Sequence, residues 1–192
     1  MIVAEAAEVF IENGYHRTKI STIVKRVGGS NRNIYENFGD KFGLFQAVIR
    51  GYQDRLMDGF VAAHVEHADP RTWLETFGRA YVRSSMNRAT VALHRLAIAE
   101  AQIFPELGGS VLNQAEYKLS AMVAAFLTER AAVGELEVDD AAETAGALLS
   151  MLRGERHLLA CYGIGELPGE AELDAHADRT VALFMKAVAP RA

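Results

Sequence analysis

Apolar residues recur at helical spacing along almost the whole chain, and no stretch alternates apolar and polar side chains as a half-buried strand does. The first apolar stripe ends at Asn13-Gly14, a pair that is typical of a helix terminus. Thr18 is expected to be the N-cap of a second helix, which the Gly28-Gly29 pair then ends. The pattern therefore predicts an all-α protein.

Short helices separated by tight turns occupy the first part of the chain. Ser30 is expected to cap a third helix of only about two turns, and Asp40 a fourth that continues as a connector to about residue 67. Asp69 and Pro70 fit the N-cap and first position of a longer helix. About nine helices are predicted in all. The later ones are expected over residues 70–87, 89–103, 108–132, 139–162 and 170–188.

Charge is distributed unevenly over the 192 residues, whose formal net charge is −5 at pH 7. Residues 1–50 carry more Lys and Arg than Asp and Glu, whereas residues 51–192 are acidic. Such asymmetry indicates different partners for the two parts of the chain. We therefore expect an N-terminal domain over residues 1–50 and a larger C-terminal domain over residues 51–192.

The sequence carries no targeting or membrane signal. Runs of about 18 uninterrupted apolar residues, which a membrane span needs, do not occur. The N-terminus lacks the basic flank and the cleavage site of a signal peptide. The single cysteine, Cys161, cannot form an intramolecular disulfide, which fits a reducing compartment. We expect a cytoplasmic protein.

Polar side chains crowd onto the short third helix, within the stretch VGGSNRNIYENFGDK (residues 27–41). Ile34 and Phe38 share one face of this helix and are expected to be its buried pair. The remaining side chains can form an ordinary solvated surface, but they also fit the DNA major groove. Arg can bind guanine, Asn can bind adenine, and Tyr and Lys can hold phosphates. Helix, turn and short helix together predict a helix-turn-helix unit.

The segment VFIENGYHRTKISTIVKRVGGSNRNIYENFGDKFGLFQAVI (residues 9–49) resembles the TetR-type one-component transcriptional regulators. The shared features are a Gly-aromatic pair after the first helix, a Thr before the second and a Gly-x-Ser turn. A hydrophobic-Tyr-x-x-Phe recognition helix and a Lys opening the fourth helix complete the pattern. These features fall at Gly14-Tyr15, Thr18, Gly28-Gly29-Ser30, Ile34-Tyr35-Glu36-Asn37-Phe38 and Lys41.

The resemblance implies roles for individual residues in binding an operator. Glu36 is unfavourable near DNA, because its carboxylate repels phosphates unless it accepts a hydrogen bond from cytosine N4 or pairs with Arg32 four residues earlier. Base edges are expected to be contacted by Asn31, Arg32, Asn33 and Tyr35. The DNA backbone is expected to be held by Thr18, Lys19, Ser30, Tyr35, Asn37 and Lys41.

Regulators of this type dimerise, because one recognition helix covers too few base pairs to be selective. The last two helices are the natural interface and could form a four-helix bundle with their symmetry mates. Alternatively, the same faces pack within their own subunit. The predicted interface residues are Ala142, Ala145, Gly146, Leu149, Leu152, Ala177, Val181, Phe184 and Val188.

The stretch ATVALHRLAIAEAQIFPEL (residues 89–107) resembles the C-terminal domain of the AefR-like branch of the same family. That resemblance implies an effector pocket between the central helices, and repression that a small molecule relieves. For each lining candidate, ordinary core packing is the alternative. The candidates, whose character favours an apolar or aromatic effector, are Phe77, Tyr81, His94, Ile98, Phe104, Met122, Phe126 and Met151.

Other classes of function find less support in the sequence. There is no phosphate loop and no His-Glu-x-x-His motif, and we expect neither an enzyme nor a cofactor. His64 and His67 could bind a metal as part of HVEH, although two solvated histidines are the simpler interpretation. Cys161 has His157 as its one candidate activating base. A sensor that has lost its operator is the remaining alternative.

Overall fold

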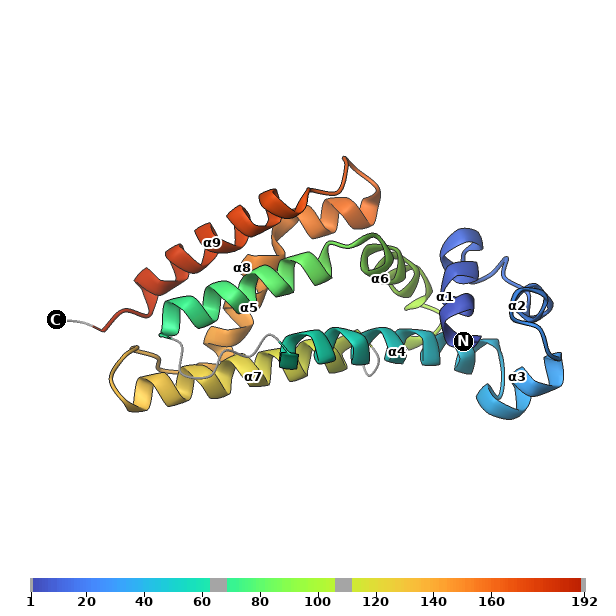
Figure 1. Cartoon of the computed structure of the whole chain (residues 1–192), viewed down its shortest axis with the longest axis horizontal. Coiled ribbons are helices and arrows are strands. Elements are labelled where there is room, and N and C mark those ends of the chain that lie inside the picture. The colour runs from blue at the N-terminus through green and yellow to red at the C-terminus, as the bar shows by residue number, and fades with distance from the viewer. Residues whose placement is uncertain (1, 63–68, 106–111, 191–192) are drawn as a thin grey trace. The chain divides into compact units, whose positions relative to one another are not determined.

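The computed structural model describes residues 2–62, 69–105 and 112–190, and within these ranges it contains nine helices and no strand (Figure 1). The predicted all-α fold is therefore confirmed for the described residues. None of their helices is long and apolar enough to cross a membrane. The helices are α1 (Ile2–Asn13), α2 (Ile20–Val27), α3 (Asn31–Phe38), α4 (Lys41–Ala62), α5 (Pro70–Ser85), α6 (Arg88–Glu100), α7 (Leu112–Ala132), α8 (Ala141–Tyr162) and α9 (Glu170–Ala187).

Side-chain caps set the starts of α3, α4 and α5 as the sequence predicts. Ser30, Asp40 and Asp69 each accept a hydrogen bond from the backbone N–H three residues further on, at 3.3, 2.7 and 3.1 Å. Each bond satisfies one of the N–H groups that the first turn of a helix leaves without a partner. Pro70 occupies the first turn of α5, where its missing N–H has no cost.

The predicted cap at Thr18 is wrong. The N-cap of α2 is Lys19, whose side chain makes no capping hydrogen bond. The hydroxyl of Thr18 points back toward α1 and donates to the carbonyl oxygens of Gly14 at 2.8 Å and Val9 at 3.3 Å. Gly14 directly follows α1, and the Val9 carbonyl also accepts a hydrogen bond of 3.0 Å from the Asn13 side chain. Thr18 therefore closes the turn after α1 instead of starting α2.

The chain forms two compact units that do not follow its linear order. The first unit comprises Met1–Arg55 and Ala92–Gln114, and the second comprises Leu56–Val91 and Ala115–Ala192. Leu93 and Leu96 of α6, and Phe104 after it, pack on the apolar core of the first unit, in which Leu93 is 2 % exposed. The domain boundary at residue 50 stays a prediction, and the first compact unit extends beyond it to Arg55.

Aromatic rings form the centre of the first unit. Phe10 of α1 lies edge-on to Phe45 of α4, with ring centroids 5.1 Å apart, and Tyr15 lies 5.2 Å from Phe45. Ile23 of α2 and Ile34 of α3 are fully buried against the same cluster. One core therefore holds α1, α2, α3 and the start of α4, so the orientation of α3 is fixed by burial and not by its own short length.

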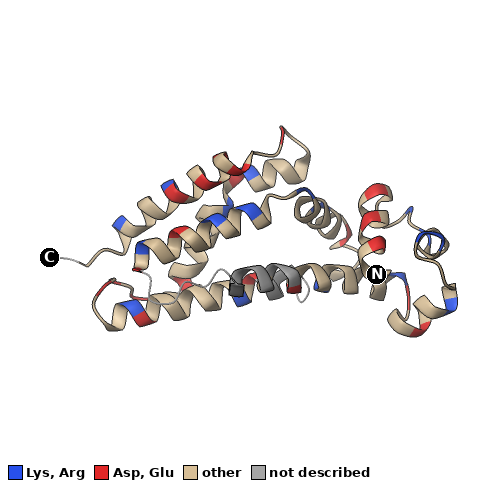
Figure 2. Cartoon of the chain, viewed as in Figure 1, with Lys and Arg blue, Asp and Glu red and all other residues tan. Residues whose placement is uncertain are grey.

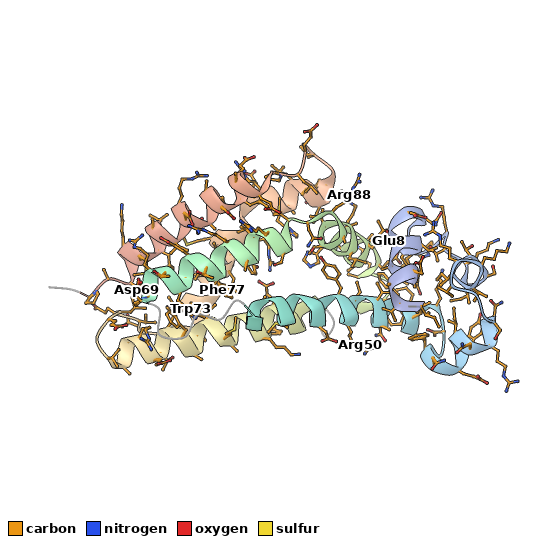
Figure 3. All side chains as sticks on the ribbon, viewed as in Figure 1. Glu8, Arg50, Asp69, Trp73, Phe77 and Arg88 are labelled. Carbon is orange, nitrogen blue, oxygen red and sulfur yellow. The ribbon has the colours of Figure 1, made fainter. Side chains whose placement is uncertain are left out.

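In the second unit, α5 packs against α8 and α9 (Figure 1). Trp73 and Phe77, both labelled on α5 in Figure 3, have parallel rings 5.4 Å apart, and Trp73 stacks on Phe126 of α7 at 3.9 Å. Gly78 lets the helices approach closely, because a Cβ at this position would lie 3.2 Å from the Leu152 side chain of α8. Trp73 and Phe77 are buried in this core, and Phe126 packs against it half-buried.

Helix α8 is interrupted at Gly154, although the sequence predicts one continuous helix there. Gly154 has φ 58° and ψ −175°, a conformation that residues with a Cβ rarely adopt. The interruption leaves the carbonyl oxygen of Leu152 without its helical donor. This oxygen accepts a hydrogen bond of 2.9 Å from the ring Nε2 of His176 in α9. A side chain from a neighbouring helix thus replaces the backbone donor that the break removes.

Candidate nucleic-acid interface

Helix α3 presents an almost entirely polar surface because only two of its residues face the protein. Ile34 is buried at 1 % exposure and Phe38 is half-buried, which confirms the predicted apolar pair. Tyr35 is 51 % exposed, a large value for an aromatic residue. The predicted contact residues around this helix that are exposed are Lys19, Ser30, Asn31, Arg32, Asn33, Tyr35 and Asn37. Their contacts with DNA stay a prediction.

The turn between α2 and α3 depends on two glycines. Gly28 has φ 74° and Gly29 has φ 106°, both in the region that favours glycine. Gly28 also donates its backbone N–H to the carbonyl of Val24 at 2.9 Å, which ends α2. The chain therefore reverses within a few residues, and α2 and α3 form a helix-turn-helix pair.

Two side-chain pairs, each one helical turn apart, occupy the exposed side of α3. The Nε of Arg32 donates to the Oε1 of Glu36 at 2.7 Å. The Nδ2 of Asn37 donates to the Oδ1 of Asn33 at 2.6 Å and to its backbone carbonyl at 2.7 Å. Of the two alternatives for Glu36, the structure contains the pairing with Arg32. Such i,i+4 pairs limit the rotamers of the side chains that they join.

Lys41 lies at the base of this motif and is engaged with the protein. Its Nζ donates to the backbone carbonyls of Tyr15, His16 and Thr18 at 3.0, 3.4 and 3.2 Å. The ammonium group also lies 4.4 Å above the centre of the Tyr15 ring. An ammonium group has three N–H donors, so these three carbonyls can use all of them. In this conformation Lys41, like the 3 % exposed Thr18, stabilises the turn between α1 and α2.

Burial makes Tyr15 a poor acid. Together with the nearby carboxylates of Asp40 and Glu100, burial raises the pKa of the Tyr15 phenol to about 12. Tyr15 therefore remains neutral near pH 7, and its ring offers Lys41 an uncharged face. The role of this conspicuous residue is thus structural.

Charges on α1 and α2 are of opposite sign (Figure 2). Helix α1 carries Glu5, Glu8 and Glu12, and α2 carries Lys25 and Arg26 in its last turn. The Arg26 guanidinium forms an ion pair of 2.5 Å with Glu12. Within the described residues Lys25 of α2 and Lys19, the N-cap of that helix, form no ion pair.

Two family models match this chain. The one described as bacterial regulatory proteins of the tetR family matches residues 2–48. The one described as the C-terminal domain of an AefR-like transcriptional repressor matches residues 72–190. The chain belongs to the TetR family. Its members are transcriptional regulators that bind DNA, not enzymes, so the predicted family and the prediction of a non-enzyme are confirmed.

Named relatives match over part of their length. The HTH-type transcriptional activator FasR of Mycolicibacterium smegmatis is 31 % identical over 80 residues, which are 42 % of this chain and 36 % of FasR. The HTH-type transcriptional repressor ComR of Escherichia coli is 35 % identical over 60 residues, 31 % of this chain and 27 % of ComR. The match thus spans about a third of each relative, and the two have opposite effects on transcription.

Solved structures of TetR-family proteins resemble the whole chain. A transcriptional regulator from Mesorhizobium loti has a TM-score of 0.87 and 25 % identity, covering 98 % of this chain and 95 % of its own. The flavonoid-responsive regulator FrrA has a TM-score of 0.76 and 29 % identity, covering 100 % and 96 %. The nine described helices therefore follow the order of a TetR regulator.

Two polar contacts of this TetR chain could not be found from the sequence. The phenol of Tyr81 donates to Glu116 at 2.7 Å and accepts from Arg153 at 2.8 Å, and Arg153 also pairs directly with Glu116. In the first unit, the ring of His16 meets the buried Glu100. The partners lie far apart in sequence, so no motif indicates these contacts. The one sequence signal is a charged residue on an otherwise apolar helix face, which suggests that it has a buried partner.

The predicted effector-lining residues divide between the two units. In the second unit Phe77 and Tyr81 are buried, and Met122 and Phe126 pack against the same core. In the first, Phe104 stacks on Phe42 with centroids 4.3 Å apart. His94 is half-buried, whereas Ile98 and Met151 are exposed. The assignment of these residues to an effector pocket stays a prediction.

Most of the predicted dimer residues fill the chain's own core. Ala145, Leu149, Leu152, Ala177, Val181, Phe184 and Val188 are all buried. They are buried because α8 and α9 pack on α5 of the same chain, which is the alternative interpretation of these apolar faces. From the predicted set, Ala142 is exposed and Gly146 half-buried. A groove of about 520 Å³ lies on the surface of α8 and α9, and its lining includes Ala147, Met151 and Leu183.

The candidates for metal and thiol chemistry remain without support. His64 and His67 lie outside the described residues. Among the described residues, no three His, Cys, Asp or Glu side chains gather as a metal site would require. Cys161 is buried, with its Sγ 3.5 Å from the Nε2 of His157, and burial lowers the pKa of that imidazole. A buried thiol beside a neutral imidazole is a core contact that a substrate does not reach.

Proposed function

We propose that the protein is a repressor that binds a palindromic operator as a homodimer and leaves it when a small molecule occupies the C-terminal unit. The observation that carries the proposal is the polar, exposed surface of α3, held on the core by Ile34 and Phe38. An outward polar helix of this length contributes little to the core. Its fixed orientation after a tight glycine turn is what insertion into a major groove requires.

The contacts divide into base and phosphate contacts. Arg32 and Asn33 are assigned to base edges, since their side chains carry the donors and acceptors that guanine and adenine need. The exposed residues Tyr35 and Lys19 are assigned to phosphates. Lys41 and Thr18 act indirectly, by holding the turn between α1 and α2 with the hydrogen bonds described above.

Dimerisation is assigned to the outward faces of α8 and α9. Met151 is 36 % exposed and Leu183 is 59 % exposed, and both line the groove of about 520 Å³. Tyr162, at the end of α8, is 69 % exposed. Apolar side chains gathered on one surface favour association, and a two-fold pair presents the same surface twice. The resulting two recognition helices would contact two half-sites.

The effector is assigned to the second unit, beside Phe77 and Tyr81. Stacked aromatic rings there favour an apolar or aromatic molecule, and Tyr81 with Arg153 offers polar groups to orient it. The similar structure named a flavonoid-responsive regulator supports an aromatic effector. Repression is favoured over activation by the AefR-like repressor model that matches residues 72–190, although FasR is an activator.

Selection from a random pool of DNA duplexes with the purified chain tests this function. We expect enrichment of a palindrome, retarded as a complex with two protein chains. A reporter placed behind that palindrome then distinguishes repression from activation. Arg32→Ala should relax base preference at one position in each half-site, at a cost of about 1–3 kcal/mol. A chain that enriches no sequence would be a sensor without an operator.

A further inference from the structure

The ion pair on the recognition helix is arranged unlike a pair that serves stability. Arg32 and Glu36 are 85 % and 59 % exposed in their side chains, and water weakens such a pair so far that it adds little to folding. It nevertheless has a short hydrogen bond of 2.7 Å and a definite direction, from Nε to Oε1. The main effect of the ion pair is therefore to restrict the orientation of the Arg32 guanidinium group.

Glu36 engages only the Nε of Arg32, whose side chain is 85 % exposed. Within the described part of the chain the two Nη groups of Arg32 make no hydrogen bond. These are the donors that bind O6 and N7 of one guanine in a bidentate, end-on contact. The neighbouring pair is built in the same way, because Asn37 holds the Oδ1 of Asn33 from one turn further on.

We propose that Glu36 is a positioning residue for base selection: it orients Arg32 so that each half-site requires guanine beneath the Nη groups. The inference rests on the proposed function, since it presupposes that α3 enters the major groove. Glu36 itself touches no base in this arrangement. The Glu36 carboxylate repels phosphates and so weakens binding to DNA of any sequence. It also fixes the orientation of the Arg32 guanidinium group, which increases the preference for guanine.

Three variants of Glu36 separate orientation from charge. Glu36→Gln keeps an oxygen that accepts from Nε but removes the charge, so we expect tighter binding to all sequences with an unchanged preference for guanine. Glu36→Ala removes the acceptor and should lower the preference for guanine over the other bases roughly tenfold. In an Arg32→Ala background, Glu36→Ala should leave base preference at that position unchanged.

The chain contains a matched control. Arg71 and Glu75 form another i,i+4 ion pair, on α5 in the second unit, in which Arg71 is exposed and Glu75 is half-buried. Glu75→Ala removes the same kind of pair and should change neither base preference nor DNA affinity. Thermal unfolding of Glu36→Ala should resemble that of Glu75→Ala, because water reaches both ion pairs and each adds little to stability.

Base preference is measured by sequencing the DNA that each variant selects, with affinities for the wild-type palindrome and for single guanine replacements. An unchanged guanine preference in Glu36→Ala, with tighter binding to every sequence, would overturn the inference and make Glu36 a repulsive surface charge only. Failure of the wild-type chain to select any sequence would instead contradict the proposed function, and the inference with it.

Discussion

The carboxylate of Glu100, at the end of α6, lies 2.9 Å from the ring Nε2 of His16 in the turn between α1 and α2. Glu100 is buried at 4 % exposure, and its Oε2 makes no aligned hydrogen bond among the described residues. A buried carboxylate is costly without a compensating partner. His16 is the group that compensates it, and it thereby attaches the end of α6 to the helix-turn-helix motif.

Removal of His16 should therefore destabilise the protein through Glu100. We expect His16→Ala to lower the free energy of unfolding by about 1–3 kcal/mol, because it leaves the carboxylate buried without its partner. The double variant His16→Ala/Glu100→Gln should recover part of that loss, since the buried charge is gone. Urea denaturation of the four chains of this cycle measures the coupling. Strictly additive effects would mean that the two groups do not interact.

Lys41 and Lys19 should have different effects on DNA binding and on stability. Lys41→Met removes the donor to three backbone carbonyls and should lower the free energy of unfolding by about 1–3 kcal/mol while leaving the salt dependence of DNA binding unchanged. Lys19→Met should leave stability unchanged and reduce the slope of log affinity against log salt by about 0.9 per protomer, or about 1.8 for the dimer. The opposite result for Lys41 would assign it a direct phosphate contact.

Leu183 tests the surface proposed for dimerisation. Leu183→Glu places a charge where an apolar side chain is 59 % exposed, and should weaken dimerisation by about 2 kcal/mol or more. Val133, 64 % exposed in the turn after α7, is the matched control, and Val133→Glu should leave the dimer intact. Sedimentation equilibrium measures both. Equal effects of the two substitutions would place the interface elsewhere.

His157 should make stability depend on pH. Burial, reinforced by the positive charge of Arg153, lowers the pKa of His157 in the folded chain. The unfolded chain therefore binds the proton more readily, and stability should fall as the pH drops below about 6.5, the ordinary value for histidine. His157→Gln and His157→Leu should both lose less stability than the wild-type chain between pH 7 and pH 5. An equal pH dependence of all three would assign the effect to other groups.

The amino-acid sequence alone predicted the helices and the family. Helix periodicity and the caps at Ser30, Asp40 and Asp69 depend on residues close together in the chain, so their effects are visible in one dimension. The anchoring of α3 by Ile34 and Phe38 followed from the same local spacing. Thr18 was misassigned because its hydroxyl has two competing sets of partners, and only the fold brings the carbonyl of Val9 within reach.

Tertiary structure alone decided which apolar faces are available to a partner. Leu149 and Val181 have the same spacing whether they meet a second chain or α5, so the pattern could not distinguish the two. The tertiary structure also decided which polar and charged side chains meet, since Tyr81, Glu116 and Arg153 come from three helices. Local sequence determines how each helix forms and which side is apolar. What each side packs against depends on contacts between distant residues, which only the folded chain specifies.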